Sequence, residues 1–143
     1  MQPQRLHFLL IAKEKKMEYG ISKSSGLGFD ETIEKVTEEL KKEGFGILTT
    51  IDIKETLKNK LGIDTDKYMI LGACNPNFAH KALEMEQELG LLLPCNVIVY
   101  EKDGDVHVSV MNPEIMSSVT GNEKLAEVAG EVKSILDNVI ANV

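Results

Sequence analysis

The sequence predicts an α+β protein in which a curved, mainly antiparallel sheet carries two long helices on one face. Three observations predict this class. Short apolar runs of strand length recur along the chain, amphipathic stripes of helical period lie near both ends, and an Asp-Gly turn separates the last two runs. With two short middle helices set aside as insertions, the order is strand, helix, four strands, helix, which suits one sheet with a helical layer. We expect residues 17–143 to form one such domain.

The first half of this pattern begins with residues 17–23, which alternate apolar and polar side chains as a half-buried strand does. Asp30 is the predicted N-cap of the first long helix, and Gly44 is its predicted left-handed end. Residues 45–53 read as the second strand. Residues 52–59 are predicted as a short helix that stops at Gly62.

The second half begins with residues 68–74, a strand that is apolar on both sides. Asn75-Pro76 then opens a helix, because asparagine caps helices well and proline suits the first helical position. We expect Phe78, Ala79, Ala82 and Leu83 to form the inner face of this helix and Gly90 to close it.

Residues 97–100 and 106–111 are predicted as a hairpin, followed by a loop of serine, threonine and glycine after Pro113. The last helix is predicted from Asn122 as its cap and from one continuous apolar face: Leu125, Val128, Ala129, Val132, Ile135, Leu136, Val139 and Ile140.

The composition excludes several classes of function. The net charge of −7 argues against a nucleic-acid-binding groove and against docking on an anionic membrane, since both need surplus lysine and arginine. Two cysteines in 143 residues do not form a disulfide framework and fit the reducing cytoplasm. The apolar run Leu6–Ala12 is too short to span a membrane. We interpret residues 1–16 as an appendage and Met17 as the functional start.

The candidate site consists of Cys74 and Cys95, each of which lies at a junction between elements and beside a proline or a capping asparagine. A thiol before a helix N-terminus can have its pKa lowered and become a nucleophile or a metal ligand. If the intervening helix returns the chain to the same sheet edge, the two thiols could form a disulfide or share a metal. The alternative is that both are small core side chains. No zinc-type spacing is present, and we predict no metal ligand set.

Other polar residues are weaker candidates. Asp52 and Lys54 follow a strand end, and His80 lies on the helix after Cys74, but solvated surface positions explain all of them. His7 and His107 are also expected at the surface. The sequence has no complete phosphate-binding glycine loop, nucleophile elbow or paired-carboxylate motif, so it identifies no reaction and no cofactor.

Two motifs carry a resemblance to a known family. Gly72-Ala-Cys-Asn-Pro76 and Gly90-Leu-Leu-Leu-Pro-Cys95, with a valine-rich strand after them, resemble the bacterial and archaeal family catalogued as domain of unknown function 302. The segments Phe45–Leu48, Asp52–Lys54 and Leu61-Gly62 fit in the same order. The resemblance implies a fold like that of the TATA-binding protein and a homodimer, and it implies no established activity. Similarity of fold does not bring DNA binding with it.

From these observations we expect a small cytoplasmic protein that binds a ligand or undergoes redox chemistry through Cys74 and Cys95. Asn75, Pro76 and Pro94 are the supporting residues, and a small-molecule or anionic ligand is the expected partner. The alternative is a structural module without chemistry that forms a homodimer and uses its cysteines only for packing. Whether the protein is an enzyme is left open.

Overall fold

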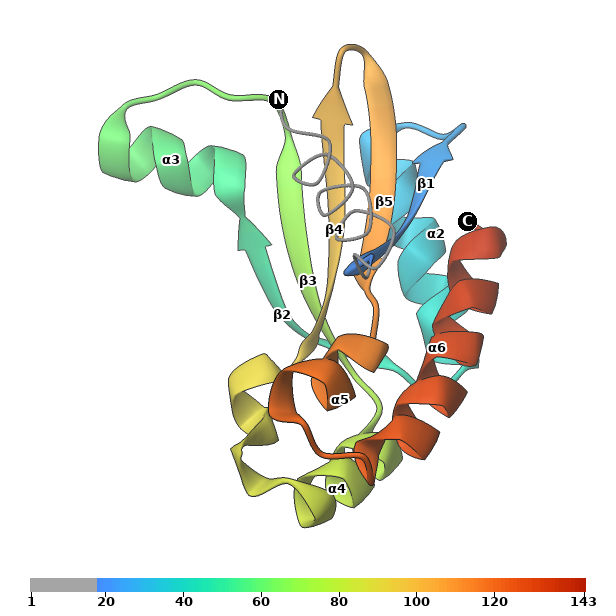
Figure 1. The fold of residues 1–143 in the computed structure, drawn as a ribbon. Helices are drawn as coiled ribbons and strands as arrows, with labels where there is room; N and C mark the ends of the chain where they lie inside the picture. The colour runs from blue at the N-terminus through green and yellow to red at the C-terminus, as the bar shows by residue number, and fades with distance from the viewer. Residues whose placement is uncertain (1–17) are drawn as a thin grey trace, which may run out of the picture.

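The computed structural model describes residues 18–143, which form a five-stranded antiparallel sheet with helices packed on it (Figure 1). The order of strands across the sheet is β1-β5-β4-β3-β2, and every neighbouring pair is antiparallel. The strands are β1 (Gly20–Ser25), β2 (Gly46–Asp52), β3 (Tyr68–Cys74), β4 (Cys95–Lys102) and β5 (Asp105–Met111). The α+β class and the antiparallel sheet are confirmed.

The helices lie between and after the strands. They are α2 (Phe29–Lys42), α3 (Ile53–Leu61), α4 (Pro76–Met85), the 3-10 helix η1 (Gln87–Leu92), α5 (Glu114–Thr120) and α6 (Leu125–Ala141). Within the described part of the chain, no helix is long and apolar enough to cross a membrane.

The order of elements differs from the predicted one because α5 replaces a predicted loop and η1 is an additional element. The Asn112 side-chain oxygen accepts a hydrogen bond of 3.0 Å from the Glu114 N–H, and the Pro113 carbonyl accepts one of 3.0 Å from the Met116 N–H. These bonds start a helical turn, and burial of Met116 holds it against the rest of the protein. The segment Glu114–Thr120 is therefore helical because of its tertiary contacts, although its serine and threonine residues have weak helix propensity.

Several further boundaries were predicted wrongly. Helix α6 has Lys124 and not Asn122 as its N-cap, and β1 covers Gly20–Ser25 instead of residues 17–23. Helix α2 begins one residue before Asp30, and its N-cap is Gly28, which makes no side-chain capping bond. Helix α4 ends at Met85, and the extended conformation of Glu86 separates it from η1, so Gly90 does not close it. Leu83 is 37% exposed and does not belong to the inner face. Met17, the predicted first residue of the domain, lies outside the described residues.

The main core forms between one face of the sheet and helices α2 and α6. The strand register places Val97 opposite both Leu71 and Val110, and all three side chains are buried against this helical layer. Val36 from α2 and Leu136 from α6 are fully buried in the same cluster. This arrangement agrees with the two apolar stripes read from the sequence.

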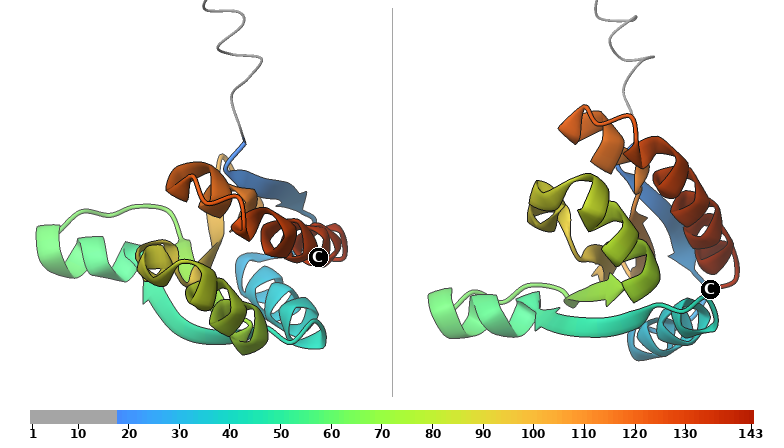
Figure 2. Two further views of the ribbon diagram at one scale, coloured as in Figure 1. Left: turned by 60° about the horizontal axis from the view of Figure 1, so that its bottom comes forward. Right: turned by 90° about the horizontal axis from the view of Figure 1, so that it is seen from below.

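A second, smaller core lies beyond one end of the strands, where α4, η1 and α5 gather at the bottom of Figure 1. Figure 2 shows the same three elements grouped beside α6 in two further views. The buried residues of this second core are Ala82, Leu89, Cys95, Met116 and Leu125. One of the two cysteines is therefore part of this second core, at the end of the sheet where β3 stops and β4 starts.

Candidate functional site

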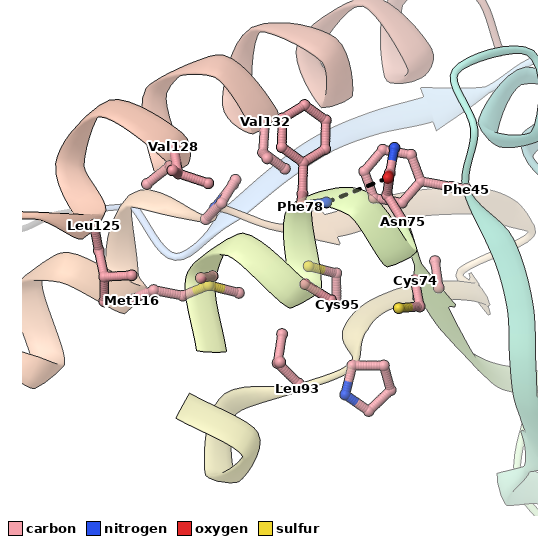
Figure 3. A pocket seen from close by; sticks show the side chains of 16 residues that line it. Phe45, Cys74, Asn75, Phe78, Leu93, Cys95, Met116, Leu125, Val128 and Val132 are labelled. Carbon is pink, nitrogen blue, oxygen red and sulfur yellow. Dashed lines mark hydrogen bonds between the residues drawn. The ribbon is translucent and has the colours of Figure 1, made fainter. Parts of the chain in front are cut away.

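A small pocket lies at this end of the sheet, and sixteen residues line it (Figure 3). Its volume is about 50 Å³. The walls come from the end of β3, the start of β4, and helices α4, α5 and α6. Most of the lining side chains are aliphatic or aromatic, and they include Phe45, Phe78, Met116 and Val132. The pocket is therefore apolar and only a few atoms wide.

Both cysteines line this pocket. Ala73 pairs with Cys95 across β3 and β4, so Cys74 and Cys95 end and begin neighbouring antiparallel strands. Both are free thiols and no disulfide joins them. Cys74 is half-buried, whereas Cys95 is only 7% exposed. The structure thus brings the two residues together at one site through the return of the chain by α4 and η1.

The two thiols differ in environment. Burial in the apolar pocket raises the pKa of Cys95 to about 11, and the nearby Cys74 adds to this rise. Cys95 therefore stays protonated at neutral pH and is a poor nucleophile. Cys74 is the thiol that solvent reaches.

The side chain of Asn75 is held by hydrogen bonds to the protein backbone. Its side-chain oxygen accepts hydrogen bonds from the N–H groups of Asn77 at 3.2 Å and Phe78 at 3.5 Å, which makes it the N-cap of α4. Its amide nitrogen donates to the Glu43 carbonyl at 3.2 Å. Pro76 occupies the first turn of the helix and does not line the pocket. These bonds lock the backbone that follows Cys74, and they occupy two of the N–H groups that an anion would need.

Pro94 lines the pocket beside Cys95, and its position depends on Gly72. A β-carbon built on Gly72 would lie 2.8 Å from the ring of Pro94 and would also collide with the Thr49 side chain. Only glycine at this position lets the proline ring rest on β3. Because Pro94 is bonded to Cys95, this contact helps to set where the second thiol lies.

The weaker candidates lie elsewhere. Asp52 caps α3 by accepting a hydrogen bond of 3.0 Å from the Glu55 N–H, and Lys54 donates to the Thr65 carbonyl. Asp52 pairs with Met69, at the opposite end of β3 from Cys74. The imidazole of His80 is 78% exposed and lies 3.2 Å from the Glu84 carboxylate. None of these three candidate side chains lines the pocket.

Sequence reasoning missed several residues of the site. Met116, Leu125 and Val128 line the pocket from α5 and α6, but Met116 fell in a predicted loop and the other two were assigned only to the core. Phe45 lines the pocket although it was predicted as the start of a strand. The one usable signal was the apolar pair Ile115-Met116 after Pro113, which indicates a buried turn.

The site contains few groups that could hold a hard metal ion. Among residues 18–143, no three or more His, Cys, Asp or Glu side chains are close enough to form a metal site. No carboxylate and no imidazole lines the pocket. Its reactive atoms are sulfur atoms in an apolar wall.

The protein is thus a small α+β protein with a five-stranded antiparallel sheet of strand order β1-β5-β4-β3-β2 and two cysteines at one end of that sheet. The family model described as "Domain of unknown function DUF302" matches residues 21–143, and the chain belongs to this family. The chain is similar to a solved protein described as "uncharacterized conserved protein DUF302 from Bacillus stearothermophilus", with a TM-score of 0.83 and 29% sequence identity. That similarity covers 88% of this chain and 98% of the other. No curated protein matches the chain.

Proposed function

We propose that this protein binds a very small ligand in the thiol-lined pocket, with Cys74 as the residue that makes the first contact. The observation that carries the proposal is the meeting of two free cysteines in one apolar pocket at the end of the sheet. Two cysteines that serve only for packing need not line a cavity, because protein interiors are close-packed.

The size of the pocket limits the class of ligand. Its volume of about 50 Å³ is small beside the cavity of about 150 Å³ that holds benzene. Pockets for drug-sized molecules measure roughly 300–1,000 Å³. The ligand is therefore a species of a few atoms that interacts favourably with sulfur and with apolar walls, and not a nucleotide or a large metabolite.

The difference in burial supports separate roles for the two thiols. Cys74 is half-buried and reachable, while Cys95 is buried at 7% exposure and protonated at neutral pH. A ligand or reagent that enters from solvent meets Cys74 first. Cys95 then contacts the ligand from inside the pocket.

Thiol counting tests this proposal. We expect iodoacetamide to alkylate Cys74 in the native, reduced protein at pH 7.5, and to reach Cys95 only after denaturation. Cys74→Ser should abolish native labelling, and Cys95→Ser should leave it in place as the matched control. If neither thiol reacts before denaturation, the pocket is closed to solvent and the proposed binding role is wrong.

A second candidate function is that of a structural module without chemistry. We propose that this module forms a homodimer through the sheet face opposite α2 and α6. On this face Ile51, Ile70 and Ile98 form a row across three strands, and Ile51 is 45% exposed. The rings of Tyr68 and Tyr100 stack at 5.4 Å between centroids, and those of Tyr100 and His107 at 5.1 Å. This apolar and aromatic surface favours a protein partner, and a second copy of the chain is the candidate that we propose.

Light scattering after size-exclusion chromatography tests the dimer. We expect the wild-type protein to be dimeric, Ile51→Glu to be monomeric, and Leu61→Glu to stay dimeric as a control at an exposed apolar position on α3. A monomeric wild-type protein at micromolar concentration would remove this candidate.

A further inference from the structure

The walls of the pocket carry no charged side chain. None of the sixteen lining residues is an aspartate, glutamate, lysine, arginine or histidine. Figure 3 shows hydrocarbon side chains of α4 and α6 among them, such as those of Phe78 and Val132. Apart from the sulfur-containing residues, the one polar side chain in the lining is that of Asn75, which already bonds to the backbone. An ion that entered this space would lose its water without gaining an opposite charge, which is strongly unfavourable.

The N-terminus of α4, where an anion could bind, is already satisfied. Pro76 has no N–H group, and the N–H groups of Asn77 and Phe78 donate to the Asn75 side-chain oxygen at 3.2 and 3.5 Å. The bond from Phe78 is the dashed line in Figure 3. The Ala79 N–H donates to the Asn75 carbonyl at 2.9 Å. Residues 76–79 therefore offer an anion no free backbone donor.

We propose that the ligand of this pocket is an uncharged, apolar molecule of about two to four non-hydrogen atoms, such as a short alkyl compound, bound against the hydrocarbon walls beside Cys74. This inference rests on the proposed binding function and names the class of its ligand. The size follows from the volume of about 50 Å³, compared with about 150 Å³ for a cavity that holds the six carbons of benzene. The absence of charge in the ligand follows from the walls and from the occupied helix N-terminus.

The sulfur atoms in the lining fit a ligand of this class. Sulfur is polarisable and forms only weak hydrogen bonds, so thiols and thioethers pack much like hydrocarbon. Cys95 is 7% exposed, and burial raises its pKa to about 11, so it presents an uncharged S–H group at neutral pH. Cys95 and Met116 thus extend the apolar wall, and this role does not require their sulfur atoms to meet.

Alkylthio transfer to Cys74 tests the preference for an uncharged ligand. The probes are methanethiosulfonates with an ethyl, a sulfonatoethyl (negative) or a trimethylammonioethyl (positive) group. The Cys74 sulfur bonds to the alkylthio sulfur, the bond to the sulfonyl sulfur breaks, methanesulfinate leaves, and the thiol proton passes to solvent. Each rate on the full-length, reduced protein is divided by the rate of the same reagent with N-acetylcysteine. We expect the ethyl reagent to be roughly tenfold faster than both charged reagents.

Surface charge alone predicts a different order of rates. The net charge of −7 attracts a positive reagent and repels a negative one, so the ethyl reagent would then lie between the two. That order, or equal normalised rates for all three reagents, would overturn the inference. Peptide mass spectrometry shows that the transferred group is on Cys74.

The length of the alkyl group and a matched pair of variants test where this group lies. From methyl to ethyl to propyl, the normalised rate should rise by roughly two- to fourfold for each added CH₂ group that the pocket buries. Ala79→Leu fills part of the pocket and should remove this rise. Ala126→Leu, at an exposed position of α6, should keep it. A rise that persists in a folded Ala79→Leu protein would place the alkyl group outside the pocket and contradict the inference.

Xenon and iodide supply a second readout that needs no reaction at a thiol and no variant. The two have the same number of electrons and differ in charge. Xenon under pressure should shift the ¹³C-methyl NMR signals of Met116, Leu125 and Val128 in a saturable way, because these side chains line the pocket. Iodide at the same concentration should leave them in place. Saturable shifts with iodide, or none with xenon, would refute an uncharged ligand.

These experiments also separate the two proposals. If iodoacetamide alkylates Cys74 in the native protein but the charged and uncharged reagents react equally well, the ligand class is wrong and the small-ligand pocket stands. If neither thiol reacts with any reagent in the native state and xenon shifts no methyl signal, both proposals fail.

Discussion

Replacing the buried Cys95 with alanine should change how the stability of the protein depends on alkaline pH. Burial raises the pKa of this thiol from 9.0 to about 11. In the unfolded chain the thiol loses its proton near pH 9, whereas in the folded protein it keeps it until about pH 11. Between these values the unfolded state binds fewer protons, so the free energy of unfolding falls as pH rises. Below pH 9 both states are protonated and the effect is absent.

The size of this effect follows from the two pKa values. The fall amounts to about 1 kcal/mol at pH 10 and approaches about 3 kcal/mol above pH 11. Cys95→Ala lacks this thiol, so its free energy of unfolding has no such pH-dependent term. The stability that the variant loses through its smaller side chain is the same at every pH. The difference in free energy of unfolding between wild type and variant should therefore narrow by about 1 kcal/mol between pH 8 and pH 10.

Urea denaturation of the metal-free, reduced proteins at pH 8, 9 and 10 measures this gap. Comparing the two proteins at each pH cancels the titration of lysines and tyrosines, which both share. A gap that stays constant from pH 8 to pH 10 would show that Cys95 titrates in the folded protein as it does in the unfolded chain. The burial argument for its pKa would then be wrong.

Substitutions at three further positions test the packing around the site and in the main core by urea denaturation. Gly72→Ala should destabilise the protein by about 1–3 kcal/mol, because the new methyl group meets the Thr49 hydroxyl and the ring of Pro94, and unchanged stability would show that both neighbours move aside freely. Asn75→Ala should cost about 1–2 kcal/mol through loss of the α4 cap and of the bond to the Glu43 carbonyl, whereas Asn75→Asp should recover the cap alone. Leu136→Ala should cost about 2–5 kcal/mol, since this side chain is fully buried between α6 and the sheet, and a smaller loss would mean that the core collapses around the gap.

Local signals in the sequence predicted much of the fold. The strand Tyr68–Cys74 has its predicted bounds, Asn75 caps α4, and Gly44 and Gly62 end their helices in the left-handed conformation. The Asp-Gly turn between β4 and β5 is present, with positive φ at Asp103 and Gly104. These features depend on a few neighbouring residues, whose backbone preferences are the same in any fold.

Features that depend on distant contacts were predicted less well. Helix α5 was read as a loop because Ser117, Ser118 and Thr120 have weak helix propensity, whereas burial of Met116 against the second core helps to stabilise it. Gly90 was read as the end of α4, although the chain changes direction at Glu86.

For the candidate site, the sequence by itself determined the pair of cysteines, the cap that follows Cys74 and the proline that precedes Cys95. Those are local patterns at the ends of elements. Only the tertiary structure decided that Cys74 and Cys95 line one pocket, that Cys95 is buried and protonated, and that Met116 lines the same pocket. The physical reason is that the size of the pocket, the burial of Cys95 and the choice of lining residues depend on how α4, η1, α5 and α6 pack against the sheet. No short stretch of sequence encodes that packing.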